Sequence, residues 1–342
     1  MIRPILIVAL LCYLSFASWW VISAGVVRDD GTVELLNVAC DPTRELWRDL
    51  NARFIDHYQQ DMGVMLTIRQ SHGGSSSQAR VVIEGLDADV ITLALWTDTD
   101  AVRKAGWIDE GWENKLPNRS LPYVSTIVFV VRKGNPKTIK DWPDLARNDV
   151  SVITPNPKTS GNGKWSFLAM WGAVTMRGST ESQAQDFVTQ VYRHVPVLDP
   201  AARGATMTFA QKKIGDVHLT WENEAYLEVQ EANGELEIVY PPVSVLAEPH
   251  VAIVDAVVRR KGTKAFADAY MKFLYTEEAQ EVIAQHYYRP TNEIVKRRTA
   301  DRFPPIKLFS SHDLAPTWDE INKQFFAEGG VFDQIYASGR TK

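Results

Sequence analysis

The chain has 342 residues, 45% of them apolar and 23% charged, and it carries a formal net charge of −5. This length and composition are typical of a globular protein with about two domains. Because acidic residues outnumber basic ones, we expect neither nucleic acid nor an anionic lipid surface as a partner. The seven histidines show no ligand-like spacing, so we also expect no bound metal and no cofactor.

Residues 1–27 are set apart by their apolar character. Arg3 precedes an apolar run that extends from Ile5 to Val27. A basic start followed by such a run predicts an export signal, here one that is cleaved. At about 20 residues the run is also long enough to span a bilayer, so an uncleaved N-terminal anchor is the alternative. Since Cys12 lies in this segment, cleavage would leave Cys40 as a single thiol, without an internal disulfide.

Strand and helix patterns alternate from residue 33 onward. The first part predicts strands at 33–39, 64–68 and 90–94 and helices at 43–61 and 75–86. This alternation favours parallel strands with helical crossovers. A second set follows, with strands at 126–131, 150–153 and 216–221 and helices at 164–176 and around 187–192. The last part predicts strands at 238–240 and 251–254 and helices at 263–275, 276–286 and 316–326.

The chain shows no internal repeat and no flexible linker. We therefore expect an α/β protein of two discontinuous lobes, joined by strands near residues 123–127 and 220–224. Lobe 1 is predicted to comprise residues 32–123 plus 223–300, and lobe 2 residues 124–222, with residues 301–342 packing on the lobes. A ligand cleft is expected between them, where strand C-termini and helix N-termini converge.

Several segments offer neutral hydrogen-bond donors at predicted helix starts. Such starts carry orphan N–H groups and a partial positive charge, which together favour an anion. The Trp221 indole adds a group that can only donate. Each segment taken alone is also an ordinary helix cap or core residue, and only their number predicts an anion-binding cradle. The segments are Cys40–Glu45, Ser71–Gln78, Thr159–Lys164, Ala201–Thr206 and Trp221–Glu224.

Two enzyme-like interpretations of these segments are disfavoured. Residues 160–164 resemble a P-loop, but Trp165 stands where that motif requires Ser or Thr. An α/β hydrolase would need a Gly-x-Ser-x-Gly elbow, and the sequence has none. For Arg203, contact with the ligand and pairing with a neighbouring carboxylate both remain open, and we prefer the second. His72 is expected to form structural hydrogen bonds rather than to act as a base.

Five motifs in the same order resemble the sulfate- and thiosulfate-binding proteins of bacterial ABC importers. They are residues 37–45, 69–75, 152–161, 202–206 and 215–225, and the resemblance extends from about Val33 to the C-terminus. It implies a two-lobed periplasmic-binding-protein fold of type II and no enzymatic activity. It further implies a periplasmic protein that captures sulfate or thiosulfate and delivers it to the membrane subunits of an ABC permease. We expect a monomer.

The same resemblance implies which groups hold the anion. They are the backbone N–H groups of Asp41, Gly161, Asn162 and Ala202, the hydroxyls of Ser75 and Ser160, and the indole of Trp221. Arg203 and His72 are expected directly behind these groups. Asn162 departs from the family pattern, in which glycine is common, and Cys40 replaces a bulkier or hydroxylated residue. The alternatives are a binding protein for another tetrahedral oxyanion such as molybdate or phosphate, a membrane-tethered anion sensor and, least favoured, a hydrolase.

Overall fold

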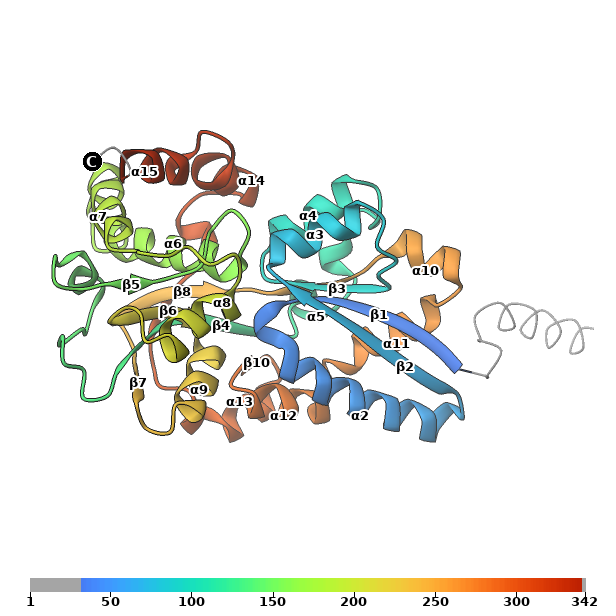
Figure 1. Ribbon diagram of the computed structural model, residues 1–342. Coiled ribbons are helices and arrows are strands. Elements are labelled where there is room, and N and C mark those ends of the chain that lie inside the picture. The colour runs from blue at the N-terminus through green and yellow to red at the C-terminus, as the bar shows by residue number, and fades with distance from the viewer. Residues whose placement is uncertain (1–31, 340–342) are drawn as a thin grey trace, which may run out of the picture.

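The computed structural model describes residues 32–339 and contains two separate sheets, which lie side by side (Figure 1). The first sheet has the strand order β2-β1-β3-β9. β1 pairs in parallel with both β2 and β3, as the alternating sequence pattern predicted, whereas β9 is antiparallel to β3. Its strands are β1 (Thr32–Cys40), β2 (Met65–Gly73), β3 (Val90–Leu93) and β9 (His250–Ile253).

Helices cover the first sheet. The longest, α2 (Arg44–Met62), buries Leu46, Leu50 and Phe54, which recur every four residues and form an apolar stripe on one face. The others are α3 (Ser75–Ile83), α4 (Trp96–Lys104), α5 (Pro117–Ser120), α10 (Asp255–Lys261), α11 (Lys264–Phe273) and α12 (Glu277–Gln285), whereas α13 (Glu293–Arg298) packs on α12 and on β10 of the second sheet. Short 3₁₀ segments lie at η1 (Asp41–Thr43), η2 (Trp112–Asn114) and η5 (Ala300–Arg302).

The second sheet is seven-stranded and is organised around β4 (Tyr123–Arg132). β4 pairs with four other strands, and this explains why its residues 125–131 are all buried. The remaining strands are β5 (Val152–Ile153), β6 (Val217–Trp221), β7 (Leu236–Val239), β8 (Val243–Ala247), β10 (Arg289–Pro290) and β11 (Lys307–Phe309).

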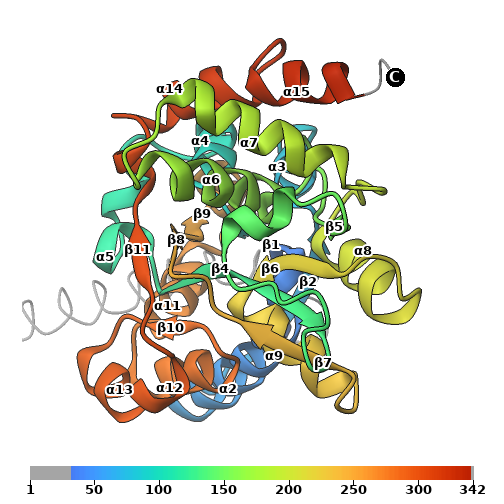
Figure 2. The ribbon, with the colours of Figure 1, turned by 90° about the vertical axis from the view of Figure 1, so that its left-hand side faces the viewer.

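Helix α6 (Gly161–Thr175) is buried on every side from Gly161 to Ala173 because it lies between the second sheet and the C-terminal segment (Figure 2). Trp165 packs edge-on against Trp318, with ring centroids 5.2 Å apart. The other helices of this half are α7 (Glu181–Arg193), α8 (Ala202–Thr206), α9 (Glu222–Glu231), α14 (Trp318–Ile321) and α15 (Val331–Gly339). Shorter 3₁₀ or π segments are η3 (Trp142–Ala146), η4 (Met207–Gln211), η6 (Ser311–Asp313) and η7 (Asn322–Phe326).

Three expectations differ from the structure. Residues 223–247 join the second sheet through α9, β7 and β8, although we assigned them to the first half. Helix α6 begins three residues earlier than Lys164, because Ser160 caps it and its first turn is buried. The helix expected at 316–326 is divided into α14 and a π segment. The predicted signal or anchor at 1–27 lies outside the described residues, and within residues 32–339 no helix combines the length and apolarity needed to cross a membrane.

Candidate functional site

The four helix starts that the sequence singled out lie between the two sheets. Asp41 directly follows β1 and opens η1, while Ser75 follows β2 after Gly74 and opens α3. Gly161 opens α6 and Ala202 opens α8. Parallel strands carry their carboxyl ends to one edge of a sheet, so η1 and α3 start at the same edge. All seven predicted ligand residues are buried, with exposed fractions of 5% or less where a fraction is given: Asp41, Ser75, Ser160, Gly161, Asn162, Ala202 and Trp221.

Direct contacts connect these starts across the two halves of the molecule. A Cβ atom added to Gly161 would overlap with the Cβ of Ala94 and lie 3.1 Å from the Cβ of Ser75. The backbone N–H of Arg203, next to Ala202, donates to Asp41 Oδ2 at 3.2 Å. The start of α6 therefore touches that of α3, and the start of α8 touches η1.

The end of β6 belongs to the same group. Asn162 Nδ2 lies 3.5 Å from the hydroxyl oxygen of Thr220, the residue before Trp221. The Trp165 indole donates to the Ala94 carbonyl at 2.8 Å, which joins α6 to the segment after β3. In this cluster of predicted residues, Asp41 and Ser75 of the first half each contact a helix start of the second half, and Asn162 contacts the end of β6.

Several donors in this cluster have no partner in the described part of the chain. The Trp221 indole nitrogen is fully buried and unpaired. The N–H groups of Gly161 and Asn162 stand in the first turn of α6, beyond the reach of its own hydrogen bonds. Ser160 Oγ accepts from the Gly163 N–H at 3.3 Å, and among residues 32–339 no acceptor takes its proton. Because an unpaired buried donor costs about 1–3 kcal/mol, these groups indicate a guest that supplies acceptors.

Ser75 differs from Ser160. Its hydroxyl donates to Asp98 Oδ2 at 2.6 Å and accepts from the Ala94 N–H at 2.9 Å. The Ser75 proton therefore already has a charged acceptor.

The charged groups beside the cluster compensate one another. Arg203 lies between Glu45, at 2.5 Å, and Glu224, at 3.2 Å, while Asp41 pairs with Arg44 at 2.7 Å. Burial raises the pKa of Glu224 to about 8, and the Arg203 guanidinium opposes this shift. The guanidinium is thus turned toward carboxylates, the arrangement that we preferred for it.

His72 also lies beside the cluster. Its Nε2 atom lies 2.7 Å from the side-chain oxygen of Gln70, and its Nδ1 atom 3.4 Å from the Cys40 carbonyl. Burial lowers the pKa of this imidazole, which favours its neutral form. The side chain thus links β2 to the end of β1 by hydrogen bonds.

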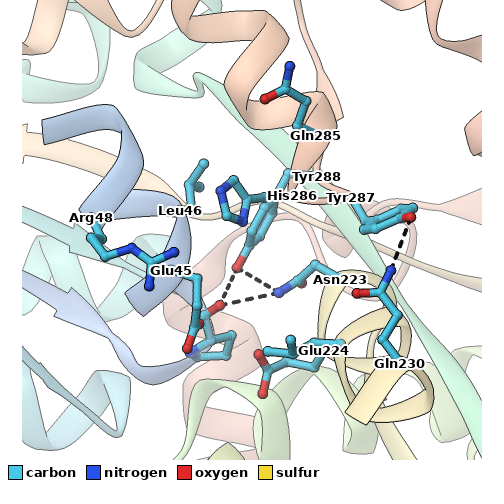
Figure 3. Close-up of a pocket in the computed structure, with 12 residues that line it drawn as sticks. Glu45, Leu46, Arg48, Asn223, Glu224, Gln230, Gln285, His286, Tyr287 and Tyr288 are labelled. Carbon is cyan, nitrogen blue, oxygen red and sulfur yellow. Dashed lines mark hydrogen bonds between the residues drawn. The ribbon is translucent and has the colours of Figure 1, made fainter. Parts of the chain in front are cut away.

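A pocket of about 330 Å³ opens next to this cluster, between α2, α9 and the segment that follows α12 (Figure 3). None of the seven predicted residues lines it. In its wall, the Asn223 amide donates to the Pro42 carbonyl at 3.2 Å and to the Tyr288 hydroxyl at 2.9 Å (Figure 3). Tyr288 also donates to the Pro42 carbonyl, at 2.8 Å. These bonds fix η1, and with it the Asp41 N–H, against the start of β10.

Sequence reasoning missed two residues of the cluster. Asp98, in the first turn of α4, accepts from Ser75 and from Lys164, which reaches it from α6 across the two halves at 3.1 Å. Lys164 was considered only as a P-loop residue. One signal was present, since an acidic residue soon after a buried strand often lies at a ligand edge. In the described part of the chain, no group of three or more His, Cys, Asp or Glu side chains is arranged to hold a metal ion.

Comparison with known proteins identifies the family. The family model described as "Bacterial extracellular solute-binding protein" matches residues 36–289. The chain belongs to this family. It is 51% identical over 305 residues to the sulfate-binding protein of Escherichia coli (strain K12), a match that covers 89% of this chain and 93% of that protein. It is 48% identical over 305 residues to the thiosulfate-binding protein of Pseudomonas aeruginosa, covering 89% and 92% of the two chains.

A solved structure agrees with this family. The sulfate-binding protein SubI from Mycobacterium tuberculosis H37Rv superposes with a TM-score of 0.77 at 33% identity, covering 86% of this chain and 99% of that one. The expected two-lobed α/β binding-protein fold is thereby confirmed. Membership also confirms that the chain is a solute-binding protein rather than an enzyme, and it supports a location outside the cytoplasmic membrane.

Proposed function

We propose that this protein captures sulfate or thiosulfate in the periplasm and delivers the anion to the membrane subunits of an ABC importer. The observation that carries the proposal is the set of buried donors with no partner in the described part of the chain, above all the Trp221 indole and the first turn of α6. Relatives named for sulfate and for thiosulfate support the choice of anion.

The proposed donors suffice in energy without a cation in contact with the anion. A hydrogen bond to a charged partner contributes about 1.5–3 kcal/mol. Seven such bonds would supply roughly 10–20 kcal/mol, whereas micromolar affinity needs about 8 kcal/mol. The difference can offset the free-energy cost of ordering the two halves around the anion. The partial positive charges at the helix starts disperse the double negative charge of the anion.

We further propose that the two halves are lobes that close on the anion by a hinge motion. The sheet membership of the described residues favours one lobe built mainly on residues 32–122 and 250–286. The other lobe would then be built mainly on residues 123–247 and 307–339. This division revises our sequence-based boundary, because 223–247 pairs with β4.

Isothermal titration with sulfate and thiosulfate tests the proposed function. Binding of either anion at micromolar or lower concentration is expected, with molybdate and phosphate as competitors. If neither sulfur anion binds while molybdate or phosphate does, the alternative oxyanion is the ligand.

The mass of the exported protein separates a cleaved signal from a retained anchor, and its mass in solution tests the expected monomer.

A further inference from the structure

Asn223 bonds the start of α9 to the turn that carries Asp41. Helix α9 belongs to the second half of the molecule, where it packs on β4, β6 and β7. The Asn223 side-chain amide nevertheless donates to the Pro42 carbonyl of η1, in the first half, at 3.2 Å. It also donates to the Tyr288 hydroxyl at 2.9 Å, and this hydroxyl donates in turn to the same carbonyl at 2.8 Å (Figure 3). The bond between Asn223 and Pro42 therefore crosses from one half to the other.

These three groups are shielded from water. Asn223 is 6% exposed, Tyr288 is 1% exposed, and Pro42 is buried. If the halves separate, the Asn223 amide and the Pro42 carbonyl exchange their bond for bonds to water. The crossing bond then favours the closed form by its net contribution alone, which corresponds to about two- to tenfold in the equilibrium between closed and open forms. Because neither group is charged, this stabilisation should change little with salt.

The crossing bond lies between segments that carry two of the donors assigned to the anion. Asn223 follows Trp221 by two residues, in the first turn of α9. Pro42 directly follows Asp41 in η1. The Tyr288 ring also packs edge-on against the Trp221 indole, with ring centroids 6.4 Å apart. The bond thus ties together two segments, one from each half, that each supply a donor to the proposed site.

We propose that Asn223 is a positioning residue that holds the two halves together around the bound anion and so slows its release. It acts through the Pro42 carbonyl, and this inference rests on the proposed function. The anion enters while the halves are apart, before the crossing bond exists, so the rate of association should not depend on Asn223. The anion leaves only after the bond has broken, so the rate of dissociation should depend on it.

Asn223→Ala removes the crossing bond and leaves the bond between Tyr288 and Pro42 in place. Stopped-flow tryptophan fluorescence at a series of sulfate concentrations measures both rates. We expect sulfate to dissociate about three- to tenfold faster, with an association rate within about twofold of the parent. A purely structural role would lower the melting temperature without sulfate and would not separate the two rates. A parent-like dissociation rate, or a loss of affinity that lies in the association rate, would overturn the inference.

Gln230→Ala is the matched control. Gln230 also lies on α9, and its side-chain amide donates at 3.3 Å to the hydroxyl of Tyr287, the neighbour of Tyr288 (Figure 3). This bond lies at the surface and does not involve η1. Both rates should therefore stay within about twofold of the parent. If dissociation accelerates as much as in Asn223→Ala, any contact from α9 would serve equally and the role assigned to Asn223 is wrong.

If Asn223→Ala does not fold, two tyrosine variants decide the question. Tyr288→Phe removes the hydroxyl that aligns the Asn223 amide with the Pro42 carbonyl, so dissociation should become about threefold faster. Tyr287→Phe removes only a hydroxyl at the surface and should leave both rates unchanged. Equal dissociation rates in the two variants contradict the proposal. Should the inference fail while Trp221→Phe still weakens sulfate binding, the proposed function stands. If the parent protein binds no sulfur anion, both are wrong.

Discussion

The Trp221 side chain is a single buried donor that indicates a bound anion. Its indole is wholly buried at the end of β6, yet its N–H has no partner among the described residues. Two other buried indoles are paired, since Trp142 donates to the Val243 carbonyl at 2.6 Å and Trp165 to the Ala94 carbonyl at 2.8 Å. The buried Trp47 indole, which packs against the Tyr270 ring, is likewise unpaired among the described residues, so it is the position of Trp221 beside the helix starts that carries the argument. Buried polar groups in native proteins are nearly always satisfied. An unpaired indole among helix starts therefore indicates a ligand acceptor.

Trp221→Phe keeps an aromatic ring in place and removes only the donor. We expect sulfate binding to weaken by about 1–3 kcal/mol, roughly five- to 150-fold, because one hydrogen bond to a charged guest is lost. Calorimetric titration measures the change. Trp142→Phe is the matched control, because it removes an indole hydrogen bond inside the core of the second sheet. It should lower thermal stability without weakening sulfate binding. Unchanged sulfate affinity in Trp221→Phe would remove this residue from the site.

Cys40 lies directly before Asp41 and is buried, with 1% of its surface exposed. Burial raises the pKa of its thiol to about 12. At pH 8 the thiol is therefore protonated, and since only the thiolate is nucleophilic, a disulfide reagent should label it slowly. We expect a Cys12→Ser variant to react much more slowly folded than in guanidinium, where the thiol regains its ordinary pKa. Rapid labelling of the folded protein would contradict this burial.

At the scale of elements, the site depends on helix ends that approach each other closely. Gly74, just before α3, lies against the second half: a Cβ atom there would overlap with the Thr159 carbonyl oxygen and lie 3.2 Å from that of Pro200. Its own backbone, with φ −58° and ψ 133°, suits any residue. The absence of a side chain thus serves the contact between the halves rather than the local turn.

Gly74→Ala should therefore hinder closure without disturbing either half. We expect sulfate affinity to fall by about tenfold or more, while the melting temperature without sulfate changes little. Titration and thermal unfolding with and without sulfate measure both effects. Gly73→Ala is the control, because its Cβ would meet only the flexible end of the Gln78 side chain in the same half. Parent-like affinity in Gly74→Ala would mean that the halves need not approach this closely.

The same scale explains what the sequence could predict. Alternating patterns predicted the parallel strands β1, β2 and β3, because a short window contains the whole signal. β8 was missed, since its pairing with β4 joins residues more than 100 positions apart and no local feature specifies it. The start of α6 was placed too late because Gly161-Asn162-Gly163 is a poor helix former, and burial overrides that propensity. The contact between Ser75 and Asp98 likewise exists only after folding.

At the scale of the whole molecule, each half supplies part of a site that neither completes alone. η1 and α3 come from the first half, and α6, α8 and β6 from the second. Ion pairs also join the halves, between Lys164 and Asp98 and between Arg203 and Glu45. The cations in these pairs are directed at carboxylates, so the anion is left to neutral donors. Because the anion contacts only donors, whether it carries a proton of its own decides how tightly it binds.

Hydrogen phosphate and sulfate are similar in shape and charge but differ by one proton. Near pH 8, phosphate as the dianion keeps an O–H that requires an acceptor, whereas the proposed site offers donors. Leaving that group unpaired in a buried site costs about 1–3 kcal/mol. We therefore expect phosphate to bind about tenfold or more weakly than sulfate in calorimetric titrations at pH 8. Selenate, a larger dianion without a proton, controls for size and should bind more tightly than phosphate. Equal affinities for sulfate and phosphate would show that the site contains a proton acceptor.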